Sequence, residues 1–208
     1  MRWLAVALVT VVAAIGCNED SPTAPGGRIP IIVAFGDSLT SGPGLRPEET
    51  YPALLQQRLA RDGHEHRVVN AGVSGDTTAE ALARFDAALV PDTEILILAI
   101  GGNDGLRGVP VATVERNIAT MIERAQARGI DVLLCQMEAP PVGGIIYTIE
   151  FHRVYTRLAE RYRVPLVPFF LIGIIGNDEL DLDDTLHPNA AGHRLIADTI
   201  YPHLRPML

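Results

Sequence analysis

The sequence predicts an α/β protein built as a three-layer α/β/α sandwich. Three observations lead to this class: apolar runs of strand length, segments with helical periodicity between them, and polar, glycine-rich loops directly after the runs. Runs that are apolar on both faces are typical of central parallel strands covered by helices. Strands and helices that alternate along a chain predict a doubly wound sheet.

Five segments are predicted to be strands. Residues 31–35, 94–100, 131–135 and 165–170 are continuous apolar runs, and residues 67–70 form a shorter strand. Between them, apolar residues recur at helical spacing, and we interpret these stripes as core faces without a function of their own. The stripes are Tyr51, Leu55 and Leu59; Leu82, Phe85 and Leu89; Val114, Ile118, Met121, Ile122 and Ala125; Phe151, Val154, Tyr155, Leu158 and Tyr162; and Leu195, Ile196 and Ile200.

The first sixteen residues have the composition of a secretory signal. Arg2 supplies a positive charge, and residues 3–15 are almost wholly apolar. This run is shorter than the ~20 residues that a membrane-spanning helix needs. It ends in Ala14-Ile15-Gly16-Cys17, which resembles the processing box of bacterial lipoproteins. We therefore expect a lipid on Cys17, and an ordinary signal peptide with an incidental cysteine is the alternative.

These features predict three regions along the chain. Residues 1–16 are the lipoprotein-type signal peptide, residues 17–28 a flexible tether rich in proline, glycine and small polar residues, and residues 29–208 one globular domain. A lipid on Cys17 would hold an exported protein at a membrane surface of the bacterial cell envelope or periplasm, without a transmembrane helix.

Composition excludes several classes of protein. The chain is 48% hydrophobic and 20% charged, which is typical of a globular domain with a sizeable core. Its net charge is −8, without a single lysine or a basic run, so nucleic acid is not an expected partner. Cys17 and Cys135 do not make a disulfide framework. Cys135 lies inside a predicted strand, where we expect a small buried hydrophobe.

Three glycine-rich loops follow predicted strands, at residues 36–38, 70–76 and 101–104. Because ligands of doubly wound sheets bind beyond the carboxyl ends of the strands, we expect these loops to converge on one site. The first loop contains Gly36-Asp37-Ser38. A serine hydroxyl becomes a useful nucleophile only when a base takes its proton, so Ser38 needs a partner elsewhere in the chain.

The segment Asp184-Thr185-Leu186-His187-Pro188 can supply both the base and the group that orients it. His187 would take the serine proton, and Asp184, three residues earlier, would hold the other ring nitrogen. The negative oxygen of the reaction intermediate would bind the backbone N–H groups of Ser38 and Gly75 and the side chain of Asn103. We expect no cofactor and no metal. The acidic loop 178–184 lacks the calcium-loop pattern, so a solvated loop is the preferred interpretation.

Four ordered blocks, GDS at 36–38, the Gly75 loop, GGND at 101–104 and DTLHP at 184–188, resemble the SGNH (GDSL-type) hydrolases. Ser38, Gly75, Asn103 and His187 match the four residues that name this family, and Asp184 matches its triad acid. The stretches SGDTT, GGNDGLRG and VPLVPFF are similar to the bacterial periplasmic branch, which contains thioesterase/protease/lysophospholipases and arylesterases. The resemblance implies a serine ester hydrolase with a flavodoxin-like, five-stranded parallel sheet of order 2-1-3-4-5. Without a GxSxG motif, the α/β-hydrolase fold is not indicated.

The loops after the third, fourth and fifth predicted strands are apolar, which favours an acyl or aryl ester over a sugar as substrate. Their expected wall residues are Leu106, Pro140, Pro141, Val142, Ile145, Ile146, Ile172, Ile174 and Ile175. A carbohydrate O-acetyl esterase and a non-catalytic, ligand-binding lipoprotein are the alternatives. A flavin-binding protein is disfavoured, because Asp37 carries the wrong charge for a phosphate site. The oligomeric state stays open.

Overall fold

The computed structural model describes residues 28–208, so the predicted signal peptide, Cys17 and the tether up to residue 27 lie outside the described residues. Five parallel strands form one sheet in the order β2-β1-β3-β4-β5, which confirms the predicted fold class and strand order. The strands are β1 (Ile31–Gly36), β2 (Arg67–Gly72), β3 (Thr93–Ala99), β4 (Asp131–Cys135) and β5 (Leu166–Val167).

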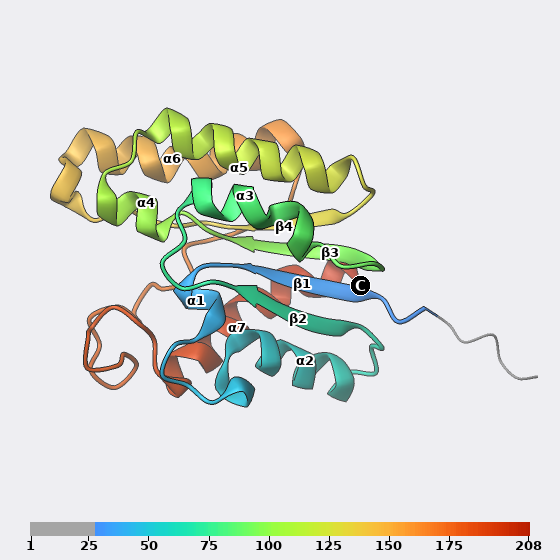
Figure 1. Cartoon of the computed structure of the whole chain (residues 1–208). Helices are drawn as coiled ribbons and strands as arrows, with labels where there is room; N and C mark the ends of the chain where they lie inside the picture. Colours follow the sequence, from blue (N-terminus) through green and yellow to red (C-terminus); the bar gives the residue numbers. More distant parts are fainter. Residues whose placement is uncertain (1–27) are drawn as a thin grey trace, which may run out of the picture.

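Helices cover both faces of the sheet (Figure 1). One layer contains α3 (Thr78–Ala88), α5 (Val111–Gln126) and α6 (Ile145–Tyr162), and the other contains α2 (Tyr51–Arg61) and α7 (Ala190–Leu204). Two short helices, α1 (Ser38–Ser41) and α4 (Gly102–Arg107), directly follow β1 and β3. Single 3₁₀ turns complete the described part: η1 (Pro47–Glu49), η2 (Pro141–Gly143) and η3 (Arg205–Met207).

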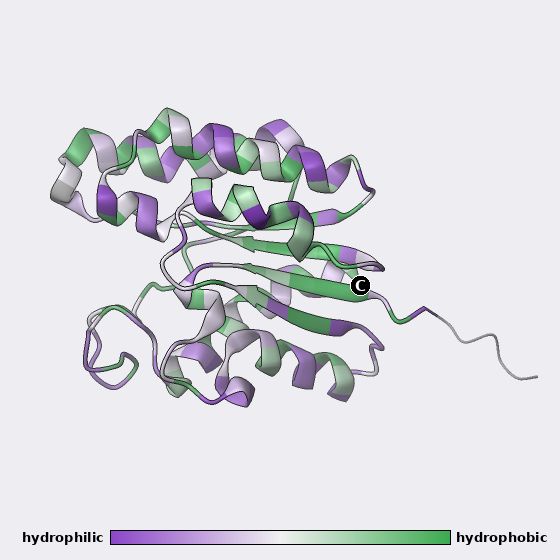
Figure 2. Cartoon of the chain, viewed as in Figure 1, coloured by the Kyte–Doolittle hydropathy of each residue, from purple (hydrophilic) through white to green (hydrophobic). Residues whose placement is uncertain are grey.

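The core lies on both sides of the central strands. All six residues of β1 are buried, and Ile32, Val33 and Phe35 are fully inaccessible to solvent. Figure 2 shows the central strands as largely hydrophobic, between two layers of helices that carry hydrophobic and hydrophilic residues in alternation. The predicted helical stripes face these strands, as Tyr51 and Leu55 of α2 illustrate, since both are fully buried. Each such apolar side chain contributes roughly 1.5–3 kcal/mol to the free energy of unfolding.

The fifth strand is shorter than the sequence predicts. Residues 165–170 were expected to be strand, but only Leu166 and Val167 pair with β4. Pro165 and Pro168 flank this pair, and a proline has no backbone N–H to donate to a neighbouring strand. The chain therefore leaves the sheet early and forms a long loop before α7.

The carboxyl ends of β1, β2 and β3 lie at the same edge of the sheet, on the left in Figure 1. The helices α1 and α4 begin there, and the loop between β5 and α7 returns to the same side. Asn189 begins α7 by accepting hydrogen bonds from the N–H groups of Ala191 and Gly192. Within residues 28–208, no helix is both long enough and apolar enough to cross a membrane.

Candidate active site

Ser38 is the first residue of α1, directly after β1. Asp37 precedes it as the N-cap, and its Oδ1 accepts the backbone N–H of Leu39 at 3.0 Å. At Gly36, a Cβ atom would lie 2.3 Å from the carbonyl oxygen of Ala99, so only glycine allows β1 and β3 to approach each other here. This tight strand-to-helix turn places the serine at the carboxyl edge of the sheet.

The structure brings Ser38, His187 and Asp184 into one line of hydrogen bonds. His187 Nε2 lies 2.9 Å from Ser38 Oγ, and His187 Nδ1 lies 2.5 Å from Asp184 Oδ2. The other carboxylate oxygen of Asp184 accepts the backbone N–H groups of Leu186 and His187. The side-chain bond to His187, followed by these backbone bonds, lowers the pKa of Asp184 to about 2. The aspartate is therefore ionised at neutral pH, as a group that orients a histidine and stabilises its charge must be.

The loop that carries this acid and base is fixed by its own backbone. The N–H of Leu182 donates to the carbonyl of His187 at 2.7 Å, and the N–H of Thr185 donates to the carbonyl of Leu182 at 2.9 Å. Asp181 and Pro188 form an isolated antiparallel bridge across the base of the loop. Thr185 has a φ of +55°, a left-handed conformation that is uncommon for threonine. These bonds hold the strained turn, which presents the acid and the base together.

On the other side of Ser38, the Gly75 loop and Asn103 line the same cavity. Asn103 Nδ2 donates to the carbonyl of Asp76 at 3.0 Å, and Arg107 Nη2 donates to the carbonyl of Gly75 at 2.9 Å. Because an amide NH₂ group has two hydrogens, Asn103 retains one for a ligand. Gly75 has a φ of +87°, and a Cβ there would meet no neighbouring atom. Glycine is therefore required at this position by the backbone conformation and not by lack of space.

Arg84 connects these loops from below, a role that sequence reasoning missed. Its Nε donates to Asp76 Oδ2 at 2.6 Å, its Nη1 to the carbonyl of Ala71 and its Nη2 to the carbonyl of Gly36, both at 2.9 Å. The guanidinium lies over the Phe35 ring, 4.3 Å from its centroid. One side chain thus ties the ends of β1 and β2 to the loop whose carbonyl orients Asn103. The only signal in the sequence is an arginine beside apolar positions of a helix.

Asp104 organises the loop after β3. Its side chain is fully buried and accepts the backbone N–H and the hydroxyl of Thr78, both at 2.7 Å. Burial raises its pKa, although the bonds from Thr78 act in the opposite direction. Asp37, Asp76 and Asp104 thus each fix hydrogen bonds in a loop, through Leu39, Arg84 and Thr78 respectively.

A cavity of about 810 Å³ opens above Ser38. Ser38, Asn103 and His187 supply polar groups to its lining, and the remaining lining is mainly apolar. The apolar lining consists of Leu39, Pro43, Leu106, Met137, Ala139, Pro140, Phe169, Leu171, Ile172, Ile175 and Leu186. The cavity therefore combines the Ser38 hydroxyl with room for an apolar group beside it.

Four of the expected wall residues, Leu106, Pro140, Ile172 and Ile175, do line this cavity. Other positions were wrong. Ile174 is 1% exposed and belongs to the core, and the lining does not include Pro141, or Ile145 and Ile146, which are exposed on the first turn of α6. The side chain of Val142 lies outside the described part.

His193 lies in the first turn of α7 and is buried. It is 1% exposed, its Nδ1 accepts the backbone N–H of Tyr51 at 3.0 Å, and the two rings stack. Burial lowers the pKa of His193 to about 4, so the imidazole is neutral and joins α7 to α2. Cys135 is buried as expected, and burial raises its thiol pKa. Among residues 28–208, no group of His, Cys, Asp and Glu is arranged to hold a metal ion.

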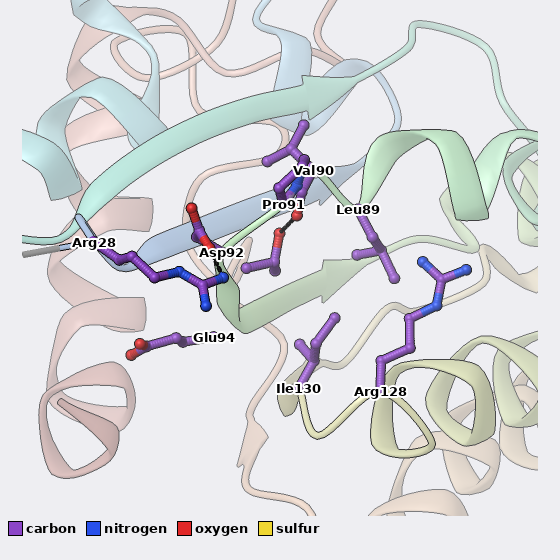
Figure 3. A pocket seen from close by; sticks show the side chains of 9 residues that line it. Arg28, Leu89, Val90, Pro91, Asp92, Glu94, Arg128 and Ile130 are labelled. Atoms are coloured by element: carbon purple, nitrogen blue, oxygen red, sulfur yellow. Dashed lines mark hydrogen bonds and ion pairs between the residues drawn. The ribbon is translucent and has the colours of Figure 1, made fainter.

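A second cavity, of about 520 Å³, lies at the opposite, amino-terminal edge of the sheet (Figure 3). Arg28 and Asp92 form an ion pair there, and Leu89 and Ile130 supply apolar walls. Its lining contains no serine, cysteine or histidine. This second cavity therefore offers no nucleophile or base of the kind found above Ser38.

A serine that follows the first strand of a parallel sheet, with its base and acid on one loop before the last helix, defines a serine hydrolase of the α/β/α type. The chain belongs to the GDSL-like lipase/acylhydrolase family, whose model matches residues 34–195. It is thus a carboxylic ester hydrolase, and the family resemblance is confirmed.

Characterised relatives cover most of the chain. The esterase TesA of Pseudomonas aeruginosa is 40% identical over 178 residues, which are 85% of this chain and 89% of TesA. The arylesterase of Vibrio mimicus is 36% identical over 83% of this chain and 87% of its own length. Thioesterase 1/protease 1/lysophospholipase L1 of Escherichia coli K12 is 33% identical over 85% of this chain and 84% of its own length.

Solved structures agree with these relatives. The crystal structure of TesA matches with a TM-score of 0.81 at 40% identity, over 86% of this chain and 99% of its own. The esterase EstA from Pseudoalteromonas sp., inhibited by monoethylphosphonate, matches with a TM-score of 0.80 at 32% identity, over 85% of this chain and 97% of its own.

Proposed function

We propose that this protein hydrolyses acyl or aryl esters through an acyl-enzyme formed on Ser38. The observation that carries the proposal is the 2.9 Å contact between Ser38 Oγ and His187 Nε2 in an apolar cavity of about 810 Å³. His187 takes the hydroxyl proton as Oγ attacks the ester carbonyl. Asp184, held on the other ring nitrogen, stabilises the imidazolium that results.

The negative oxygen of the tetrahedral intermediate then binds the N–H groups of Ser38 and Gly75 and the free hydrogen of the Asn103 amide. His187 returns the proton to the departing alkoxide or thiolate as the carbonyl re-forms. A water molecule, deprotonated by the same imidazole, attacks the acyl-enzyme, and the acid leaves as Ser38 regains its proton. No cofactor or metal enters this cycle.

The apolar lining supports an acyl or aryl group as the part of the substrate that is recognised. The volume of the cavity falls within the range of roughly 300–1,000 Å³ that is typical of small-molecule sites. The relatives are named esterase, arylesterase and thioesterase/lysophospholipase, so aryl esters, thioesters and lysophospholipids are the candidate substrates for this chain.

We also propose that the enzyme is exported to the bacterial cell envelope or periplasm and anchored by a lipid on Cys17, with residues 17–28 as a tether. The support is the apolar segment that ends in a small-residue box before Cys17. In cells fed a labelled fatty acid, the wild-type chain should incorporate the label and sediment with membranes. A Cys17→Ser chain that still carries the label would contradict this proposal.

Substitution of Ser38 by alanine tests the reaction. Hydrolysis of p-nitrophenyl acetate, butyrate and octanoate should be lost, as should labelling by a fluorophosphonate probe. Ser41→Ala is the matched control, because Ser41 lies on the same short helix but bonds to Ser74, not to His187. Full activity of Ser38→Ala would refute the mechanism. Wild-type activity that is restricted to the acetyl ester would favour an O-acetyl esterase.

A further inference from the structure

Many of the large apolar side chains that residues 28–208 expose gather where the active-site cavity opens. We call six of them the rim: Leu106, Ile145, Ile146, Ile172, Ile175 and Leu186. Ile146 and Ile172 are each 76% exposed, and even the least exposed, Leu186, is at 38%. Exposed apolar residues that lie singly on a surface need no explanation, but a contiguous group is typical of an interaction site.

The rim is assembled from three segments that meet at one edge of the sheet. The first turn of α6 lies against α4, because the Tyr147 hydroxyl donates to the carbonyls of Asp104 and Val109. Pro140, which lines the cavity, leads through η2 into that turn. Figure 1 shows this end of α6, α4 and the loop before α7 on the same side, and Figure 2 shows hydrophobic residues at this end of α6.

The rim is continuous with the catalytic cavity. Leu106, Ile172, Ile175 and Leu186 belong to both the rim and the cavity lining. A folded protein seated on these residues would obstruct the route to Ser38. A layer of lipid would instead bring acyl groups to the opening, so this continuity favours a lipid surface as the occupant.

The charge around the rim indicates which lipid. Residues 164–193 contain no arginine or lysine, whereas four acidic residues there are exposed: Asp178, Glu179, Asp183 and Asp184. Arg107, beside Leu106, is engaged by the carbonyl of Gly75 and by Glu80. An acidic margin is repelled by anionic lipids and not by neutral ones. The surface is therefore suited to zwitterionic headgroups.

We propose that the rim docks this enzyme on a zwitterionic phospholipid surface with the mouth of the cavity against the acyl layer. The inference rests on the proposed ester hydrolysis, to which it adds the physical state of the substrate. It is compatible with an anchor on Cys17. Residues 18–28, fully extended, would span at most about 40 Å, similar to the diameter of about 40 Å of a domain of this size. Arg28, where the tether joins the domain, lies at the opposite edge of the sheet from the cavity. The extended tether is long enough to cross this width, so the lipid on Cys17 and the rim can contact the same membrane.

Flotation with phosphatidylcholine vesicles tests the proposal on residues 28–208. This part contains the whole described fold, and 99% of the TesA crystal chain matches 86% of the present chain, so a domain of this extent folds alone. A Ser38→Ala background prevents hydrolysis of the vesicles. The test pair is Ile145→Ser with Ile146→Ser, which lie outside the cavity. The matched control is Ile29→Ser with Leu195→Ser, which are also exposed, at 56% and 41%, but lie away from the rim.

We expect the parent and the control pair to float, and the rim pair to bind at least about tenfold more weakly, since two isoleucines that would enter the lipid are replaced by polar groups. With Ser38 restored, all three should hydrolyse dissolved p-nitrophenyl acetate equally. Addition of phosphatidylglycerol to the vesicles should weaken binding. The proposal is overturned if the parent stays unbound, if the control pair loses binding equally, or if the rim instead holds a dimer that the rim pair dissociates. Loss of esterase activity by all three chains would refute the proposed function, whereas vesicle binding is measured without it.

Discussion

Replacement of Arg84 by methionine tests whether the site depends on a side chain that does not line the cavity. Methionine keeps an apolar stem over the Phe35 ring but removes the guanidinium. The variant loses the ion pair with Asp76 and the hydrogen bonds to the carbonyls of Ala71 and Gly36. The loop that positions the oxyanion donors is then no longer tied to the ends of β1 and β2.

The structure sets the size of the expected effects. Hydrogen bonds to charged groups contribute about 1.5–3 kcal/mol each, but the Arg84 side chain is 26% exposed, so water replaces part of what is lost. We expect the free energy of unfolding to fall by about 3 kcal/mol, the lower end of the cost of breaking a buried pair. Deletion of one oxyanion donor lowers kcat by about 10²–10³-fold. In Arg84→Met the donor Asn103 is only misaligned, so we expect kcat to fall by about 10–100-fold.

The assay separates misalignment from general loss of stability. The rates kcat and kcat/KM for p-nitrophenyl butyrate should fall together, because the interaction lost is made only in the transition state. Affinity for an alkyl boronic acid, which forms a tetrahedral adduct on serine, should fall in parallel. Both are measured below the temperature at which the variant unfolds, so that folded enzyme is compared with folded enzyme.

Arg58→Met is the matched control. Arg58 is also 26% exposed, pairs with Asp198, and lies 5.7 Å from the centroid of the Tyr201 ring, but it joins α2 to α7 away from the cavity. Because its partner Asp198 is 50% exposed, whereas Asp76 is 12% exposed, Arg58→Met should lose at most about 1 kcal/mol, as exposed ion pairs do, and keep its kcat. Wild-type kcat and boronate affinity in Arg84→Met would refute the reasoning, as would an equal kinetic loss in Arg58→Met.

Three further predictions concern buried titratable groups and the cavity wall. The folded-state pKa of His193, about 4, lies below its ordinary 6.5, so the unfolded chain binds more protons between these pH values. As the pH falls from 6.5 to 4, the free energy of unfolding of the wild type should therefore decrease by up to about 3 kcal/mol. His193→Gln should not show this decrease when unfolding is measured by urea titration. A stability difference that is independent of pH would contradict this. Burial raises the pKa of Asp37 from 3.8 to about 7, so wild-type stability present at low pH is lost as pH rises through this range. Asp37→Asn keeps an acceptor for the Leu39 N–H. In the same urea titrations its free energy of unfolding should increase relative to that of the wild type as the pH rises from 3.8 to about 7. A difference that stays constant over this range would contradict the prediction. Leu106→Glu should lower kcat/KM for the octanoate ester about tenfold and leave the acetate ester nearly unchanged, because only a long acyl chain reaches that wall; equal losses would place the acyl group elsewhere.

The fold could be predicted because its signals are local. The buried strands are apolar on both faces, and the first three strands of the chain are followed by polar, glycine-rich loops, so the alternation of strand and helix can be read along the chain. The strand order came from the family resemblance, because alternation alone does not determine it. The early end of β5 at Val167 depends on backbone donors missing at Pro165 and Pro168, which an apolar pattern does not register.

Residues such as Arg84 and His193 could not be predicted, because their partners are distant in the sequence and chemically ordinary. Arg84 bonds to groups 8, 13 and 48 residues away, two of them backbone carbonyls, and His193 accepts an N–H that is 142 residues away. Nothing near these side chains in the sequence marks them as partners of those groups. Their roles exist only once the strands and helices have packed.

Distance along the chain is nevertheless not what separates the predictable from the unpredictable. Ser38 and His187 are 149 residues apart, further than any of those pairs, and both were predicted. The link between them is chemical, since a serine nucleophile requires a base and the base requires an acid, and Asp184-Thr185-Leu186-His187 offers both in four residues. A backbone carbonyl makes no comparable demand on the residue that binds it, because any donor will serve. Catalytic groups can therefore be inferred from one another, whereas the side chains that hold them in place must be found in the structure.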